Sequence, residues 1–150
     1  MSSNDKILLV EDEADLARLF ELALAREGLR VRRVRDADTA LDIFRRWRPD
    51  LVLLDVVLPG MSGLDFLAML RQESAVPVIL VSGRRRPSDL ALGSRLGATD
   101  YLVKPFSLTE LRSRVKLALS RAAPRAPGRA APRARKSSPA LRPAGRSALR

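Results

Sequence analysis

The sequence predicts an α/β fold in which five strands alternate with five helices, forming a parallel sheet with helices on both faces. One observation is a series of short apolar runs bounded by Pro, Gly or acidic residues, which is typical of buried strands. A second is that segments with apolar residues at helical spacing separate these runs. A third is that polar side chains stand at the ends of the runs, as Asp55 does after Leu51–Leu54. In an open sheet of this kind, ligands bind at the carboxyl ends of the strands.

The expected strands are short. They cover residues 6–10, 30–34, 51–55, 77–81 and 100–104. The second alternates Arg with Val, which is typical of a half-exposed strand. We interpret the basic residues in and after this strand as a solvated edge rather than a binding patch, because sheet edges often carry charge. They are Arg30, Arg32, Arg33 and Arg35.

The expected helices are bounded by caps and breakers. These are Gly28 and Pro49 after the first two helices, Ser62 before the third, Pro87 and Gly97 around the fourth, and Ser107 before the fifth. Glu110 follows Ser107 in a capping-box pattern. The apolar face of the fifth helix is expected to hold Leu108, Leu111, Val115 and Leu119. Gly93 lowers the helix propensity of the fourth segment, and Trp47 at the end of the second is expected to pack at the core edge.

Composition excludes several classes of site. The 150 residues include no Cys and no His. Disulfides, Cys or His metal sites, catalytic triads that use His and a phosphohistidine on this chain are therefore excluded. The remaining nucleophiles are carboxylates, hydroxyls and lysines. No apolar run approaches the roughly 20 residues of a membrane span, and the start is too acidic for a signal peptide. A cytoplasmic protein without membrane contact is expected.

Charge divides the chain into two parts. The net charge is +11, and residues 121–150 contribute eight Arg, one Lys and no acid, whereas the rest holds 19 basic and 17 acidic residues. We expect a folded domain at 1–122 and a disordered Arg/Ala/Pro-rich basic tail at 123–150, with no second domain. The tail is interpreted either as a solubilising linker or as a nonspecific nucleic-acid binder. Sequence-specific DNA recognition is not expected, since no helix-turn-helix pattern or stacking aromatic is present.

Polar residues at four strand ends predict one site. Glu11 and Asp12 follow the first strand, and Asp55 ends the third. Ser82 follows the fourth strand, and Lys104 ends the fifth. Three carboxylates in a partly buried site repel one another, and an all-oxygen ligand set favours Mg²⁺. With a lysine and a hydroxyl beside them, a carboxylate nucleophile forms a phosphoryl-accepting site. The alternative is a buried Lys–Asp ion pair with acidic turn caps.

The same residues resemble the receiver domain of two-component response regulators, from about residue 6 to about residue 122. The matching motifs are Lys6–Asp12 (KILLVED), Asp50–Asp55 (DLVLLD), Leu58–Gly63 (LPGMSG), Val81–Gly83 (VSG) and Tyr101–Phe106 (YLVKPF). The resemblance implies a flavodoxin-like (βα)₅ fold with strand order 2-1-3-4-5.

The resemblance also implies a role for each acidic residue. Asp55 would accept a phosphoryl group from a partner histidine kinase or phosphotransfer protein. Asp12, Asp55 and the backbone carbonyl of Val57 would hold Mg²⁺, with Glu11 assisting through water. The chain would take part in its own phosphorylation and dephosphorylation without being an enzyme in its own right.

By the same resemblance, the remaining site residues bind the phosphoryl group and transmit its presence. Ser82 would hydrogen-bond the group and Lys104 would pair with it. Tyr101 matches the family's switch aromatic, and Pro105 matches a proline that is often preceded by a cis peptide. Phosphorylation would shift the face formed by the fourth helix, fifth strand and fifth helix.

The sequence departs from the family at three places around this face. Gly83 stands where alanine is common, Arg84–Pro87 replaces an often acidic stretch, and Thr99–Asp100 replaces Asp-Asp. These departures bring the family's common homodimer on phosphorylation into question. Val57 and Arg84 occupy the positions that tune dephosphorylation in the family, so the lifetime of the phosphorylated state is expected to be individual to this chain.

Three other functions stay open. An aspartate-nucleophile phosphatase of the haloacid-dehalogenase type requires an acid two residues after Asp55, where Val57 stands. A pseudo-receiver adaptor would bind partners without phosphorylation, although every site residue is present. A nucleic-acid-binding protein would use the basic tail and keep the receiver for regulation.

Overall fold

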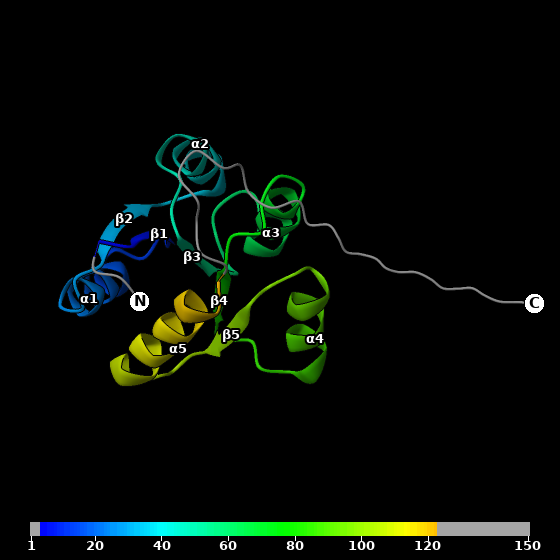
Figure 1. The fold of residues 1–150 in the computed structure, drawn as a ribbon. Helices are drawn as coiled ribbons and strands as arrows, with labels where there is room; N and C mark the ends of the chain where they lie inside the picture. Colours follow the sequence, from blue (N-terminus) through cyan, green and yellow to red (C-terminus); the bar gives the residue numbers. More distant parts are fainter. Residues whose placement is uncertain (1–3, 123–150) are drawn as a thin grey trace, which may run out of the picture.

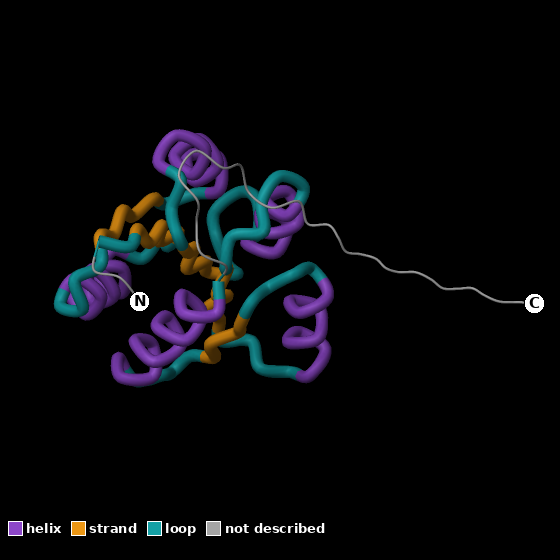
Figure 2. Tube along the Cα trace, viewed as in Figure 1, coloured by secondary structure: helices purple, strands orange, loops and turns teal. Residues whose placement is uncertain are grey.

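The computed structural model describes residues 4–122 as strands and helices in strict alternation (Figures 1 and 2). The strands are β1 (Lys6–Val10), β2 (Arg30–Val34), β3 (Leu51–Asp55), β4 (Val78–Ser82) and β5 (Asp100–Val103). The helices are α1 (Ala14–Ala25), α2 (Ala37–Trp47), α3 (Gly63–Arg71), α4 (Pro87–Arg95) and α5 (Leu108–Arg121). Each predicted element is present, and only β4 and β5 differ at their ends by a residue. The expected tail, 123–150, lies outside the described residues.

The strands form one parallel sheet in the order β2-β1-β3-β4-β5, which confirms the predicted flavodoxin-like arrangement. β1 pairs with both β2 and β3, so the strand order reverses there. The register aligns the carboxyl ends, because Val10 pairs with Leu54 and Asp55 pairs with Val81. The loops that follow β1, β3 and β4 therefore leave the same edge of the sheet.

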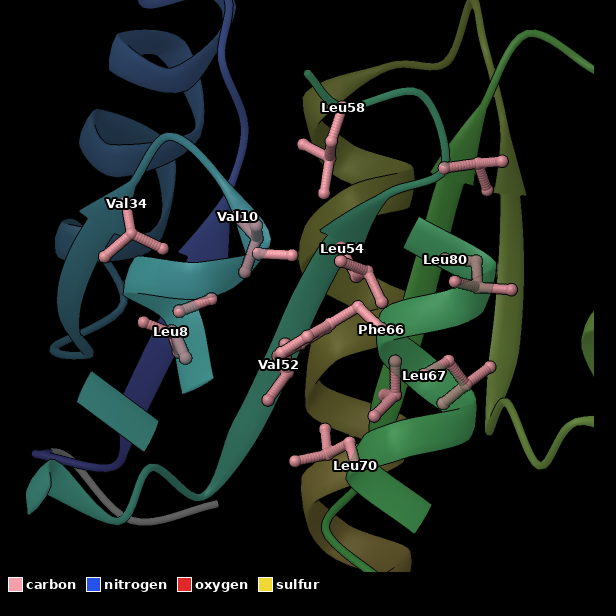
Figure 3. Packing of buried hydrophobic residues seen from close by; sticks show 14 of the residues in the cluster. Leu8, Val10, Val34, Val52, Leu54, Leu58, Phe66, Leu67, Leu70 and Leu80 are labelled. Carbon is pink, nitrogen blue, oxygen red and sulfur yellow. The ribbon is translucent and has the colours of Figure 1, made fainter. Parts of the chain in front are cut away.

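Two apolar layers enclose the sheet. On one face, α2 and α3 cover alternate residues of the central strands, and Figure 3 shows Phe66 of α3 beside Val52 and Leu54 of β3. On the other face, α1 and α5 cover the residues between them, including Leu53 and Ile79. β3 and β4 are buried at every position, which explains why their sequences are continuous apolar runs rather than alternating ones.

Side-chain caps hold two of the predicted helix starts. The Ser62 hydroxyl accepts from the Asp65 amide at 3.1 Å, and the Ser107 hydroxyl accepts from the Glu110 amide at 3.0 Å. The Glu110 carboxylate accepts from Arg114 instead of reaching back to the Ser107 amide. Of the two hydrogen bonds of the predicted capping box, the one accepted by the Ser107 hydroxyl is therefore formed. The expectation that Leu108 lies on the buried face is wrong. It is 36% exposed, because the buried face of α5 is built from later residues, Leu111, Val115 and Ala118.

Glycine allows α4 to approach the sheet closely. Within Pro87–Arg95, Gly93 is the one buried residue. A Cβ at this position would lie 2.8 Å from Leu80 Cδ1 and 3.2 Å from Tyr101 Cδ2. The residue that lowers the helix propensity of α4 is therefore also the residue that lets the helix lie this close to β4 and β5.

A second close approach joins α3 to the end of β3. The Gly63 amide donates to the Val56 carbonyl at 2.8 Å. A Cβ on Gly63 would clash with the backbone carbonyl of Asp55 and lie 2.8 Å from Val56 Cα. Because the obstructing atoms are backbone, no side-chain rotation relieves the contact. Gly63 therefore fixes the loop that begins at Asp55.

Within residues 4–122, none of the helices combines the length and the apolar character that crossing a bilayer requires.

Gly63→Ala should destabilise the domain by about 1–3 kcal/mol, since overpacking against backbone forces the chain to shift. Gly83→Ala is the control, because a Cβ there would meet nothing within 4 Å. Urea denaturation of the two variants and the parent measures the difference. Equal midpoints for Gly63→Ala and Gly83→Ala would show that α3 does not close on β3 as described.

Candidate functional site

The structure brings the five predicted polar residues to one edge of the sheet. Asp55 and Ser82 are the last residues of β3 and β4, and Glu11 and Asp12 directly follow β1. Lys104 directly follows β5, and its amide donates to the Ser82 carbonyl at 2.8 Å. The pairing of the strands thus places these five residues at one edge, independently of the contacts between their side chains.

Three carboxylates share the centre of this edge. Glu11, Asp12 and Asp55 each offer an oxygen, and these atoms lie within 4.8 Å of one another. Glu11 is 1% exposed and Asp55 is 5% exposed, whereas Asp12 is exposed. The Asp55 Oδ1 atom accepts from the Val57 amide at 2.9 Å, and Lys104 Nζ lies 3.4 Å from Asp55 Oδ2.

Glu11 is the residue whose charge is least compensated. Burial, and then the negative charge of Asp55, raises the pKa of Glu11 to about 7. Its Oε2 atom accepts from the Glu13 amide at 3.2 Å, but its buried Oε1 atom has no hydrogen-bond partner among the described residues. A buried acceptor without a partner is costly unless an ion or water completes it.

This donor set fits a hard divalent cation. All three side chains offer oxygen, which Mg²⁺ and Ca²⁺ prefer, and a cation would relieve the mutual repulsion of the acids. The unpaired Glu11 Oε1 belongs to the same cluster. Lys104 compensates the charge of Asp55 only weakly, because their 3.4 Å contact is longer than the roughly 2.7–2.9 Å of a strong charge-assisted hydrogen bond. A cation could therefore neutralise the remaining negative charge of the cluster.

The loop after β4 positions the hydroxyl of Ser82. Its oxygen accepts from the Arg84 amide at 3.0 Å, so the hydroxyl hydrogen stays available to a ligand. Arg85 donates to the Lys104 carbonyl at 3.0 Å and so ties this loop to the loop after β5. The Lys104–Pro105 peptide is cis, as the sequence resemblance implies.

The remaining predicted residues lie around this centre. Tyr101 is partly buried on β5, where it pairs with Leu80 and packs against the core beneath α4. Val57 is 58% exposed, and Arg84 and Pro105 are exposed. The metal contact of the Val57 carbonyl, the switch role of Tyr101 and the tuning role of Arg84 stay predictions.

The interpretation of the β2 arginines as a purely solvated edge is wrong for Arg33. Its Nε donates to the Glu11 carbonyl at 3.0 Å and its Nη2 donates to the Asp12 carbonyl at 2.9 Å. The alternation of β2 places residue 33 on the face opposite Arg32, but only the register shows that it reaches the loop after β1. Arg32 lies on the other face, with its Cζ 5.4 Å from the centroid of the Trp47 ring. Trp47 packs partly buried at the core edge, as predicted.

Known proteins match most of the described chain. A family model described as the response regulator receiver domain matches residues 7–116. The DNA-binding response regulator MtrA of Mycobacterium tuberculosis strain H37Rv is 42% identical over 116 residues, which cover 77% of this chain and 51% of MtrA. The sensory transduction protein RegX3 of Mycolicibacterium smegmatis is 45% identical over 117 residues, covering 78% of this chain and 51% of RegX3. The chain thus spans about half the length of the curated relatives it matches.

Solved structures show the same fold. A putative response regulator from Chloroflexus aurantiacus superposes with a TM-score of 0.75 at 34% identity, covering 79% of this chain and 99% of that one. The BeF₃-activated N-terminal receiver domain of RstA from Klebsiella pneumoniae gives a TM-score of 0.73 at 32% identity, covering 76% and 97%.

Magnesium should raise the thermal stability of the domain at pH 8, because it neutralises carboxylates that the folded state holds together. Glu11→Gln should be more stable than the parent in EDTA, by roughly 1–3 kcal/mol, since it removes a buried charge that repels Asp55. Its gain from Mg²⁺ should be smaller. Differential scanning calorimetry with and without Mg²⁺ measures both effects. A Glu11→Gln variant less stable than the parent in EDTA would argue against repulsion at this cluster.

Proposed function

The chain belongs to the response regulator receiver family of two-component systems, and from this premise we propose that Asp55 accepts a phosphoryl group in a Mg²⁺-dependent reaction. The donor is a partner histidine kinase or phosphotransfer protein. One observation carries the proposal: the buried Asp55 carboxylate lies between two further acids and the Lys104 ammonium. A structural ion pair alone would not need Glu11 and Asp12 beside it.

The transfer itself requires little covalent chemistry from the chain. A carboxylate oxygen of Asp55 forms the new O–P bond, the P–N bond of the phosphohistidine breaks, and its electron pair stays on the imidazole. The Val57 amide holds Asp55 Oδ1 at 2.9 Å and thereby orients the nucleophile. Lys104, 3.4 Å from Oδ2, can move onto a phosphoryl oxygen without leaving the site.

Glu11, Asp12, Asp55 and the Val57 carbonyl are the groups that would hold Mg²⁺. When bound, the ion would neutralise charge on the phosphoryl oxygens as they approach the carboxylates. The free Glu11 Oε1 supports this assignment, since a metal or a water on the metal would satisfy it. Exposure of Asp12 leaves the site open toward an incoming donor.

The phosphorylated site would act on α4 and β5 through Ser82. Phosphorylation leaves Asp55 with a group of about −2 charge. The Ser82 hydroxyl, held by the Arg84 amide at 3.0 Å, would donate to this group and draw residues 83–86 toward it. Tyr101 packs under α4 beside Gly93, so a shift of this loop changes the space available to the ring. The result is a population shift within one fold.

Asp55→Asn should abolish labelling by acetyl phosphate and Mg²⁺, because an amide is not a nucleophile at this site. Intact-mass spectrometry measures the labelled fraction. Asp38→Asn, an exposed position in the first turn of α2, is the matched control and should label like the parent. Labelling of Asp55→Asn to the parental extent would refute the proposed acceptor.

Lys104→Ala should still accept the phosphoryl group but fail to transmit it, because the cation that pairs with the group is missing. Hydrogen exchange of α4 and β5 amides, recorded with and without BeF₃⁻ and Mg²⁺, measures transmission. Lys116→Ala, an exposed lysine of α5 that pairs with Glu27, should respond like the parent. A parental exchange response in Lys104→Ala would contradict its role.

A further inference from the structure

Arg33 bonds two consecutive backbone carbonyls of the loop that carries the metal-binding acids. Its Nε lies 3.0 Å from the Glu11 carbonyl oxygen and its Nη2 lies 2.9 Å from that of Asp12. The side chain is partly buried and comes from the edge strand β2, where Arg33 pairs with Leu9. The planar guanidinium offers several donors in fixed directions, so it sets the relative orientation of the two carbonyls.

One peptide unit connects this guanidinium to the acidic cluster. The carbonyl of the Asp12–Glu13 peptide accepts from Arg33, and the amide of the same peptide donates to Glu11 Oε2 at 3.2 Å. A trans peptide holds its C=O and N–H in one plane and on opposite sides. Fixing the carbonyl end therefore aims the N–H at Glu11, and hydrogen bonding at one end strengthens the donor at the other.

We propose that Arg33 is a positioning residue that holds the Glu11–Asp12 loop in its metal-binding conformation. The inference rests on the proposed function, because it assigns Arg33 to the same Mg²⁺ site. Loss of an outer partner of a metal ligand typically weakens metal affinity by about 10- to 100-fold. We expect the lower end of this range, since the Asp12 contact is exposed and water can replace part of it.

Electrostatics alone predicts the opposite sign. A guanidinium bonded to the backbone of two metal-binding residues repels an incoming cation, so deleting its charge should strengthen Mg²⁺ binding. Deleting its hydrogen bonds should weaken binding if they hold the loop. The direction of the change therefore separates a positioning role from a mere surface charge.

The test compares two charge-matched substitutions on one strand. Arg33→Met keeps an apolar stem and removes both hydrogen bonds. Arg32→Met removes the same charge one residue away, on the sheet face where Arg32 packs over Trp47 and does not contact the loop. Isothermal titration calorimetry with MgCl₂ should give a Kd about tenfold weaker for Arg33→Met and no weaker for Arg32→Met. Arg33→Lys keeps the charge but cannot reproduce the paired geometry, so it should also bind Mg²⁺ more weakly than the parent.

A second measurement needs no metal. Amide exchange of Glu13, followed by NMR in EDTA, should accelerate about tenfold in Arg33→Met and stay parental in Arg32→Met, because only the first frees the Asp12–Glu13 peptide. At saturating Mg²⁺, the acetyl phosphate labelling rate of Arg33→Met should return to that of the parent, because excess ion compensates for a lower affinity.

Each outcome decides a different question. A parent chain that binds no Mg²⁺ would refute the proposed function. A parent that binds Mg²⁺, with Arg33→Met and Arg33→Lys binding equally or more tightly, would refute the role of Arg33 alone. If Arg33→Met does not fold, Arg33→Lys replaces it in both measurements. Weaker Mg²⁺ binding and faster Glu13 amide exchange in Arg33→Lys would then support the role of Arg33, and parental values would refute it.

Discussion

The constraint that governs this structure is the mutual repulsion of the carboxylates that the fold places together at one end of the sheet. Glu11 and Asp55 are almost fully buried, with Asp12 beside them, and within residues 4–122 the salt bridge to Asp55 comes from Lys104 alone. Such an arrangement costs stability in the absence of a counter-ion. The surrounding backbone tolerates this cost because apolar layers on both faces of the sheet hold the strands in register. The site is thus destabilised locally on a scaffold that is stable elsewhere, which is typical of functional sites.

The scaffold positions the site through backbone geometry more than through side chains. The reversal of strand order at β1 brings the loops after β1 and β3 together, and the Lys104 amide joins β5 to Ser82. Gly63 then lets the chain fold back directly after Asp55, and the Val57 amide becomes available to the carboxylate. These features are set by register, turn and residue size, so the acids are oriented before any ligand binds.

Most of this arrangement could be predicted from the sequence, because strand ends and helix caps are local signals. The apolar runs fixed the strands, and the acids, Ser82 and Lys104 stood at their ends. What could not be predicted depended on contacts between distant segments. The role of Arg33 requires the β1–β2 register, the exposure of Leu108 requires the placement of α5, and the unpaired Glu11 Oε1 requires three dimensions. Gly93 illustrates the same limit, because glycine lowers the intrinsic helix propensity of α4, whereas its close contact with Leu80 is visible only in the structure.

The glycine contact between α4 and the sheet has a mechanical consequence. A helix whose buried contact is a residue without a side chain has no knob locked in a hole, and few apolar atoms are uncovered when it slides along the strands beneath it. Shear of this kind needs less energy than unpacking a leucine-rich face would. Should α4 move as we propose, the bulk of Leu80 and Tyr101 beneath it would limit the distance. Enlarging or trimming either side chain would then change the amplitude of the movement rather than its trigger.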